Sequence, residues 1–396
     1  MISEDQARSA VLKATQLLPA DTLAIASALD HFAAADIRAR ISLPPFDNSA
    51  MDGYAVRAAD CRGGAPLRVI GEQPAGRDRA LRISAGEAVR IFTGAPIPDG
   101  ADAIVMQEEV SCAGETIQIK GEVKEGDFLR MSGADVAAGQ KIIQSGQRLG
   151  APQLALLAAQ GLADVLTRPA PRIALISTGD ELVAPGNVLQ RGEIYESNLI
   201  LLRALVQKCG ARVASTEHCA DDLKATENAF RNAAESDAII VSGGVSVGEL
   251  DFVKPALRKL EAKLDVWRVA VKPGKPFLFG RLGKCLVFGL PGNPVSAFVT
   301  FLLFVRPALL KMAGAAATDL DLIRASARLQ TAIANPGNRR HYLRGRLERG
   351  NFAPTGRQES HALFSLSQAN ALLPMEPEET LAEGARVNVI TWNHGI

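Results

Sequence analysis

Two segments of this chain combine glycine, hydroxyl and carboxylate residues in a pattern that suits a phosphate-bearing ligand. Residues 177–181 read Ser-Thr-Gly-Asp-Glu, and residues 242–248 read Ser-Gly-Gly-Val-Ser-Val-Gly, shortly before Asp251. Small residues ahead of a helix can turn backbone N–H groups and hydroxyls toward a phosphate. The second segment therefore predicts anion contacts from Ser242, Gly243, Gly244, Ser246 and Gly248. The alternatives without a ligand are a tight turn for 242–248 and a turn or helix N-cap for 177–181.

Two further segments add cations and the start of a helix. Residues 272–276 read Lys-Pro-Gly-Lys-Pro. Because proline restricts the backbone, Lys272 and Lys275 form a rigid pair of cations suited to an anion, although most lysines are solvated surface residues. Residues 289–296 read Gly-Leu-Pro-Gly-Asn-Pro-Val-Ser, in which Pro294 suits the first turn of a helix. We expect the N-terminus of that helix to face an anionic group.

Carboxylates accompany these segments at Asp180, Glu181, Asp221, Asp222 and Asp251. Oxygen ligands of this kind are the ones that Mg²⁺ takes in proteins, and carboxylates also transfer protons. The histidines are scattered along the chain, so the sequence does not predict a zinc site. These residue types together indicate a phosphate-bearing ligand bound with a divalent metal ion.

Charge and composition exclude several classes of protein. The 396 residues include 44 basic and 43 acidic side chains, and 5% are aromatic. A nucleic-acid binder or a polybasic membrane binder needs a sustained positive field, so we expect neither partner. Scattered cysteines without a Cys-X-X-Cys pair predict no disulfide framework and no thiolate zinc site. The start lacks an apolar segment and the run 294–305 is too short to span a bilayer, so we expect a cytoplasmic protein.

The elements that must position these residues change in character along the chain. Apolar spacing predicts helices within 5–35 and over 150–160, whereas 46–136 contains short strands separated by glycine and proline. From 171 onward, apolar strands alternate with helices, which is typical of a doubly wound, mostly parallel sheet. After 320, short strands predict a small barrel or sandwich.

We therefore predict a multidomain α/β plus β fold. A helical linker domain comprises 1–45 and 137–169, and a small β domain is inserted at 46–136. A doubly wound α/β domain spans 170–318, and a β-barrel-like domain spans 319–396. Ligands of open α/β sheets bind beyond the carboxyl ends of the strands, where the segments 177–181 and 242–248 are expected to lie.

Six segments, taken in order, resemble the signature of the molybdopterin molybdenumtransferases, the MoeA family that includes the gephyrin E domain. They are Pro-Phe-Asp-Asn-Ser-Ala-Met-Asp-Gly-Tyr-Ala at 45–55, Phe-Thr-Gly-Ala-Pro at 92–96, Ser-Thr-Gly-Asp-Glu-Leu at 177–182, and the segments at 242–248, 272–277 and 289–296. The resemblance implies insertion of molybdenum from molybdate into adenylylated molybdopterin with release of AMP, dependent on Mg²⁺. It also implies an elongated homodimer whose α/β domain resembles the molybdopterin adenylyltransferase fold.

The resemblance also implies roles for particular residues. In the family, the cleft lies between the α/β domain of one subunit and the β domain of the other. Positions that match the catalytic residues are Asp52, Thr93, Glu181, Asp221 and Asp251. The implied Mg²⁺ ligands among them are Glu181, Asp221 and Asp251, although Asp52 and Glu181 could instead orient water or transfer protons. The matching basic loop contains Arg268, Lys272 and Lys275, and the matching proline loop contains Pro291 and Pro294.

Some of these matches have simpler local readings. Asp52-Gly53 alone predicts a β-turn, and Thr93 alone predicts a hydroxyl that caps its own turn. Arg268 stands where many relatives have lysine, so its guanidinium geometry makes an anion contact there less secure. The arginine-rich segment 338–346 and the pair Ser360-His361 are either solvated or reach the cleft.

Two other functions share parts of this pattern. The adenylyltransferase step needs only the α/β domain, and a gephyrin-like scaffold would couple this unit to other domains through a long linker. The additional predicted domains and the absence of such a linker favour the insertion step. The partners implied are small-molecule substrates, a second copy of the chain, and transient contacts with molybdopterin adenylyltransferase and molybdoenzyme apoproteins.

Overall fold

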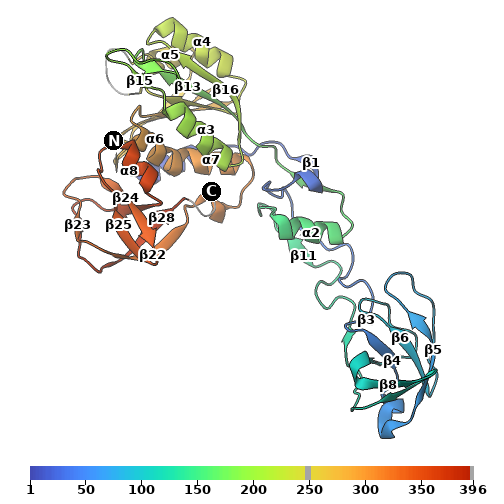
Figure 1. Ribbon diagram of the computed structural model, residues 1–396. Coiled ribbons are helices and arrows are strands. Elements are labelled where there is room, and N and C mark those ends of the chain that lie inside the picture. Colours follow the sequence, from blue (N-terminus) through green and yellow to red (C-terminus); the bar gives the residue numbers. More distant parts are fainter. Residues whose placement is uncertain (246–250, 393–396) are drawn as a thin grey trace. The chain divides into compact units, whose positions relative to one another are not determined.

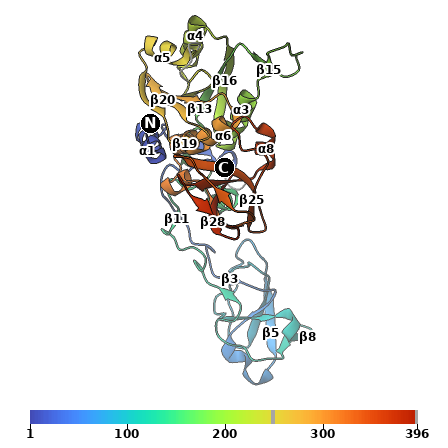
Figure 2. The ribbon, with the colours of Figure 1, turned by 90° about the vertical axis from the view of Figure 1, so that its left-hand side faces the viewer.

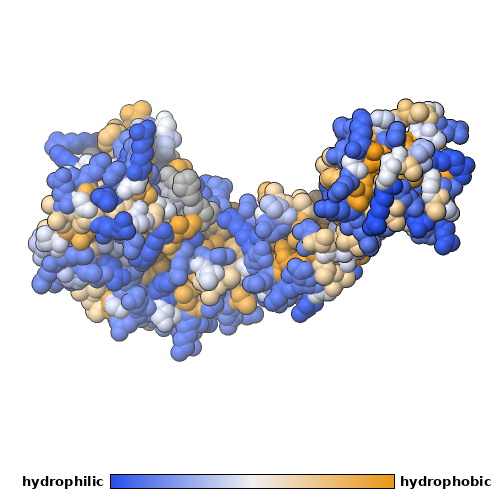
Figure 3. All heavy atoms as spheres, turned by 90° about the horizontal axis from the view of Figure 1, so that it is seen from below, coloured by the Kyte–Doolittle hydropathy of each residue, from blue (hydrophilic) through white to orange (hydrophobic). Residues whose placement is uncertain are grey.

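The computed structural model describes residues 1–245 and 251–392 (Figure 1). The chain forms two compact units. Unit 1 comprises Met1–Ala35, Ser145–Leu154 and Ala163–Ile396, and unit 2 comprises Asp36–Gln144 and Ala155–Leu162. Hydrophilic residues cover most of the face drawn in Figure 3, and apolar residues are scattered among them. The predicted boundaries of four domains remain a prediction.

Unit 1 contains the predicted doubly wound sheet. Its six strands lie in the order β16-β13-β17-β21-β20-β18. The four parallel strands are β16 (Arg212–Cys219), β13 (Arg172–Thr178), β17 (Ala238–Ser242) and β21 (Cys285–Leu290). An antiparallel edge, β20 (Pro276–Leu282) and β18 (Lys263–Arg268), was not predicted. The expectation of a mostly parallel sheet is confirmed.

Helices cover both faces of this sheet (Figures 1 and 2). On one face, α3 (Asn198–Lys208) and the run from Pro294 to Met312 pack against apolar side chains of the strands. On the other face are α4 (Leu223–Ala233) and α5 (Val253–Lys259). The central strands are buried on both faces, which explains why they read as continuous apolar runs rather than alternating ones.

The run Pro294–Met312 consists of α6 (Pro294–Thr300), a π-helical turn (Phe301–Val305) and α7 (Arg306–Met312). It is the one stretch of the described residues that is long and apolar enough to cross a membrane. However, 94% of its apolar window is buried inside the chain, so it is a core helix of unit 1.

The C-terminal part of unit 1 is a small barrel, as predicted. Its strands pair in the order β24-β25-β22-β28-β26, and β26 pairs again with β24. Their bounds are β22 (Arg324–Leu329), β24 (Arg340–Glu348), β25 (Asn351–Pro354), β26 (Ala371–Met375) and β28 (Arg386–Thr391). The short strand β19 (Val271–Lys272) extends this barrel by pairing in parallel with the start of β24. The basic segment at 272–276 is therefore attached to the barrel at one end and to the α/β sheet through β20 at the other.

Unit 2 contains a six-stranded sheet in the order β7-β4-β6-β5-β9-β8. The strands are β4 (Gly53–Val56), β5 (Leu67–Gln73), β6 (Glu87–Ile91), β7 (Ala103–Met106), β8 (Val110–Ala113) and β9 (Thr116–Ile119). They agree with the short strands that the sequence predicts within 46–136. Asp52 directly precedes β4 and Thr93 follows β6, and these two strands pair antiparallel.

The expectation of helices throughout 5–35 is wrong in its second half. Helix α1 (Glu4–Ala14) begins with a capping box formed by Ser3 and Gln6. After Pro19, however, β1 (Asp21–Ala24) pairs antiparallel with β12 (Asp164–Thr167). The strand partner lies far away in the sequence, so local apolar spacing could not reveal it. Helix α2 (Ala151–Ala159) agrees with the prediction for 150–160.

Candidate functional site

A cavity of about 800 Å³ lies at the carboxyl ends of the parallel strands of unit 1. Its floor comes from residues that follow β13, β17 and β21, and another wall comes from the segment after β19 and from the barrel. The sequence-predicted residues that line it are Glu181, Asp221, Ser242, Gly243, Gly244, Asp251, Lys272, Lys275 and Pro291. Arg268 and Pro294 do not line it, and Ser246 and Gly248 lie outside the described residues.

The loop after β17 requires glycine. Gly243 has a φ of +89°, and a Cβ there would lie 2.7 Å from the carbonyl oxygen of Thr178. Gly244 has a φ of +61°, and a Cβ there would lie 2.8 Å from the Thr178 hydroxyl oxygen. The two glycines thus let the ends of β13 and β17 approach each other closely. Ser242–Gly244 therefore forms a tight turn that only glycine allows. The phosphate contact of this turn remains a prediction.

Asn198, which sequence reasoning missed, connects two of the cavity loops. Its Nδ2 donates hydrogen bonds to the Ser242 hydroxyl (2.9 Å) and to the Gly292 carbonyl (2.6 Å). The side chain is buried at the start of α3, where Glu196 accepts hydrogen bonds from the first backbone N–H groups of the helix. The only local signal would have been a polar pair at a helix start, which usually indicates a cap.

The structure distinguishes the roles of Asp221 and Asp222, which could not be told apart from the sequence. Asp222 is the N-cap of α4, because its side chain accepts a hydrogen bond from the backbone N–H of Ala225. Asp221 lines the cavity instead, and its backbone N–H donates to Asp180. Burial raises the pKa of Asp221, and the neighbouring charges of Asp180 and Glu181 add to the rise.

Asp251 is a carboxylate with no hydrogen-bond partner for either oxygen among the described residues. Burial of the group raises its pKa to about 6, and Asp221 adds a smaller increase. A desolvated carboxylate that lines a cavity is ready to take a proton or a cation. Among the described residues, however, no group of three or more His, Cys, Asp or Glu side chains is arranged to hold a metal ion. Glu181, Asp221 and Asp251 therefore share the cavity without forming a ready three-carboxylate site.

Cations occupy the wall formed by the basic segment and the barrel. Lys272, Lys275 and Arg339 all line the cavity. The Arg339 guanidinium donates a hydrogen bond to the Val271 carbonyl, and its own carbonyl accepts one from Asn335. The arginine-rich segment thus reaches the cavity through one of its members. Lys272 pairs with His341 across the strands, and burial together with this lysine lowers the pKa of His341 to about 4, so the imidazole is neutral at pH 7.

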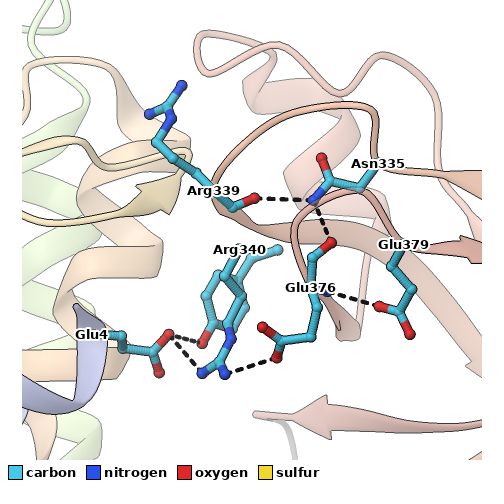
Figure 4. Close-up of polar contacts among 7 residues, drawn as sticks. Glu4, Asn335, Arg339, Arg340, Glu376 and Glu379 are labelled. Carbon is cyan, nitrogen blue, oxygen red and sulfur yellow. Dashed lines mark hydrogen bonds and ion pairs between the residues drawn. The ribbon is translucent and has the colours of Figure 1, made fainter.

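The strand that follows Arg339 is fastened to α1. Glu4 accepts hydrogen bonds from Arg340 and from the Tyr342 hydroxyl, and Arg340 also forms an ion pair with Glu376 (Figure 4). The Arg339 side chain extends away from this cluster in the same view. The cluster thereby fixes the start of β24 and leaves Arg339 directed elsewhere, toward the carbonyl of Val271.

The barrel supplies one more cavity segment, Gln358–Ser360. The Ser360 hydroxyl accepts a hydrogen bond from the side chain of Asn293, and the Ser360 carbonyl accepts one from the backbone N–H of Val295. These bonds attach the barrel segment to the first turn of α6. Helix α8 (Leu363–Gln368), which follows the segment, lies beside α6 (Figure 2).

In unit 2, the structure brings Asp52 and Thr93 together. One carboxylate oxygen of Asp52 accepts hydrogen bonds from both the backbone N–H and the hydroxyl of Thr93. These bonds, together with the charge of Arg90, lower the pKa of the exposed Asp52 carboxyl. Thr93 therefore does not cap its own turn, as its local sequence suggested, but holds an ionised carboxylate.

Comparison with known proteins places these features in one family. Three family descriptions match the chain: MoeA N-terminal region (domain I and II) at 2–161, probable molybdopterin binding domain at 174–311, and MoeA C-terminal region (domain IV) at 326–392. A Mycobacterium tuberculosis protein named molybdopterin molybdenumtransferase 2 is 40% identical over 371 residues, covering 90% of this chain and 91% of that protein. The chain belongs to the MoeA family. The resemblance noted in the sequence is therefore confirmed.

Other members of the MoeA family agree in length and fold. A Haemophilus influenzae protein named molybdopterin molybdenumtransferase is 36% identical and covers 100% of this chain and 99% of its own. The crystal structure of a molybdopterin biosynthesis MoeA protein from Pyrococcus horikoshii has a TM-score of 0.85 and 29% identity, covering 99% of this chain and 100% of that one. The predicted fold class is thus confirmed across the whole MoeA chain.

Proposed function

We propose that this MoeA family chain is a molybdopterin molybdenumtransferase. It takes molybdate and adenylylated molybdopterin, transfers molybdenum to the dithiolene of the pterin, and releases AMP. The observation that supports this most directly is the cavity of unit 1, which combines three cations, a glycine turn and four carboxylates, Glu359 among them. An oxyanion and a pyrophosphate both need cationic side chains, and this cavity offers Lys272, Lys275 and Arg339.

Each part of the cavity has a proposed role. Lys272 and Lys275, together with Arg339, neutralise the charge of molybdate and of the phosphate groups. The turn at Ser242–Gly244 receives a phosphate, and Ser246 and Gly248 extend that contact in the sequence. Pro291 shapes the loop after β21, whereas Pro294 begins α6. Arg268 does not line the cavity, so its proposed role is limited to the electrostatic field near the cavity.

Magnesium dependence is part of the proposal. The orphaned oxygens of Asp251 fit a hard cation, and Asp221 lines the same cavity. Because Mg²⁺ is usually held by one or two carboxylates plus substrate phosphates, the lack of a third ready ligand among the described residues is compatible with it. Asp251 and Asp221 would hold the ion, with Glu181 in reach of the same cavity. When bound, Mg²⁺ supplies charge neutralisation on the pyrophosphate.

A homodimer with a shared cleft is the arrangement that gives Asp52 and Thr93 a role in catalysis. Both residues belong to unit 2, whereas the cavity belongs to unit 1. We place the Asp52–Thr93 pair of one subunit at the cavity of the other, where the ionised carboxylate orients water or accepts a proton. The division into four domains given above is proposed with it.

The two alternative functions are not favoured. Whole-length relatives carry the name molybdopterin molybdenumtransferase, and the chain has a barrel and a second unit beyond its α/β sheet. Contacts with molybdopterin adenylyltransferase and with molybdoenzyme apoproteins are proposed as transient, because the former class supplies the substrate and the latter consumes the product.

The product of the reaction tests this function. Purified protein is incubated with adenylylated molybdopterin, molybdate and Mg²⁺, and the molybdenum bound to the pterin is measured after removal of free molybdate. We expect about one molybdenum per pterin, because one dithiolene holds one metal atom. A parallel incubation supplies molybdopterin and ATP instead. Adenylylated pterin formed there, with no molybdenum transferred in the first incubation, would support the adenylyltransferase function.

A further inference from the structure

A charged side chain lies behind the cavity wall rather than in it. Arg344 of β24 is 1% exposed and does not line the cavity. Its guanidinium donates hydrogen bonds to the carbonyl of Arg357 (2.6 Å) and, through both terminal nitrogens, to the carbonyl of Glu359 (3.1 Å each). A buried guanidinium needs such acceptors, because an unpaired buried charge is strongly destabilising.

Gln358 forms a second set of hydrogen bonds between β24 and the segment 357–360. The backbone N–H of Arg344 donates to the Gln358 side-chain oxygen, and the Gln358 side-chain nitrogen donates back to the Arg344 carbonyl, each at 3.0 Å. Arg344 therefore contacts residues 357, 358 and 359 in succession, from its main chain and from its side chain. At the far end of this segment, Ser360 is held by Asn293 and by Val295 of α6.

The hydrogen bonds from the Arg344 guanidinium also fix the orientation of the peptide groups in segment 357–360. In a trans peptide the C=O and the following N–H point in opposite directions. Since the carbonyls of Arg357 and Glu359 point at Arg344, the N–H groups of Gln358 and Ser360 point away from it. Neither N–H donates to an acceptor within the described residues, and both residues line the cavity.

We propose that Arg344 is a positioning residue for the reaction. It holds segment 357–360 so that backbone N–H groups of the barrel face an oxyanion of the substrates in the cavity. This inference depends on the proposed function for the nature of the anion, which is either molybdate or a substrate phosphate. A lysine at this position could keep the charge but could not reach two carbonyls with a planar fork.

The test compares Arg344→Lys and Arg344→Met with Arg346→Met in the full-length protein. Arg346 lies on the same strand but is exposed and forms an ion pair with the exposed Glu348, so its loss should leave binding unchanged. Dissociation constants for molybdate and for AMP are measured separately by calorimetry. We expect Arg344→Lys to weaken one of the two anions about tenfold while the other changes less than twofold, because only one contacts the segment.

Amide hydrogen exchange separates positioning from general destabilisation. Exchange over 355–362 should quicken in Arg344→Lys while exchange over β13 and β17 stays as in the wild type. Unchanged affinity for both anions, with quickened exchange over 355–362, would overturn the proposal. If the Arg344 variants do not fold, the wild type decides: molybdate or AMP should slow exchange at 357–360, and no slowing with either anion would contradict the role. If the wild type inserts no molybdenum, that result would instead count against the proposed function.

Discussion

Thr93 donates two hydrogen bonds to one oxygen of Asp52, at 2.7 Å from its backbone N–H and 2.8 Å from its hydroxyl. Together they lower the pKa of an exposed carboxyl. Replacing Thr93 with valine removes only the hydroxyl bond. We expect the pKa of Asp52 to move up toward its ordinary value, measured by carbon NMR titration, and molybdenum transfer to fall with the fold intact. Thr116→Val, which removes an exposed hydroxyl elsewhere in unit 2, is the control. An unmoved Asp52 titration would show that the hydroxyl bond is not what lowers the pKa.

Mixing two inactive variants tests whether the cleft is shared between subunits. Asp52→Asn and Glu181→Ala each remove a charge at the proposed site, so each homodimer should be inactive. If Asp52 of one subunit acts at the cavity of the other, a mixed dimer contains one intact site. We expect refolded mixtures to regain about a quarter of wild-type activity, because half of the dimers are mixed and each has one active site. Complete inactivity of the mixture would place both residues at one subunit's own site, and a single-chain sedimentation mass would exclude the dimer itself.

The Asn198 side chain joins the loops after β17 and β21, so its amide is expected to matter for both stability and binding. Asn198→Asp keeps the shape but replaces the Nδ2 donor with a carboxylate oxygen, which then faces the Ser242 hydroxyl and the Gly292 carbonyl oxygen. We expect a loss of about 1–3 kcal/mol in the free energy of unfolding, as for other broken buried hydrogen bonds, and weaker binding of AMP. The exposed Asn187, whose side chain donates to the nearby carbonyl of Ala184, gives the matched variant Asn187→Asp. Equal stability of the two variants in urea would contradict a structural role for Asn198.

Burial of Asp251 predicts a particular dependence of stability on pH in the metal-free protein. Its pKa rises from 3.8 to about 6 on folding, so between these values the folded state binds more protons than the unfolded state. Stability contributed by this group is therefore lost as the pH rises through that window. We expect Asp251→Asn to gain stability relative to the wild type as the pH increases from 4 to 6, measured by urea unfolding with chelator present, and to lose transfer activity. Asp265→Asn, at an exposed position, is the control of equal charge change. A flat difference for Asp251→Asn would argue against the raised pKa.

The cationic wall should be needed for anion binding rather than for folding. We expect Lys272→Gln to lower kcat/KM at least about tenfold, since one charged contact to the anion is removed, with a melting temperature close to that of the wild type. Lys284→Gln, in the turn between β20 and β21, is a control of equal charge change. The two variants are compared for molybdate affinity by calorimetry. Equal molybdate affinity of the two variants would show that Lys272 does not bind the anion.

Residues whose partners are local or periodic could be predicted from the sequence, whereas residues with distant partners could not. The apolar runs of β13 and β17 identified buried parallel strands, and the glycines between Ser242 and Val245 identified the turn that touches Thr178. Asn198 bonds to residues 44 and 94 positions away, so no local pattern indicated its role.

Buried and solvated arginines also look alike in the sequence. Arg339, Arg344 and Arg346 share one basic segment, yet the first lines the cavity, the second is buried behind it, and the third is exposed. The strand at Asp21–Ala24 likewise depends on pairing with Asp164–Thr167, which overrides the helical spacing of its apolar residues.

Release of AMP is the measurement that tests the central claim most directly. The wild-type protein is mixed with adenylylated molybdopterin, and AMP is quantified with and without molybdate and with and without Mg²⁺. The account predicts AMP release that needs both, together with loss of that release in Lys272→Gln and Asp251→Asn. Release at the same rate without molybdate would contradict a transfer of molybdenum coupled to cleavage of the pyrophosphate.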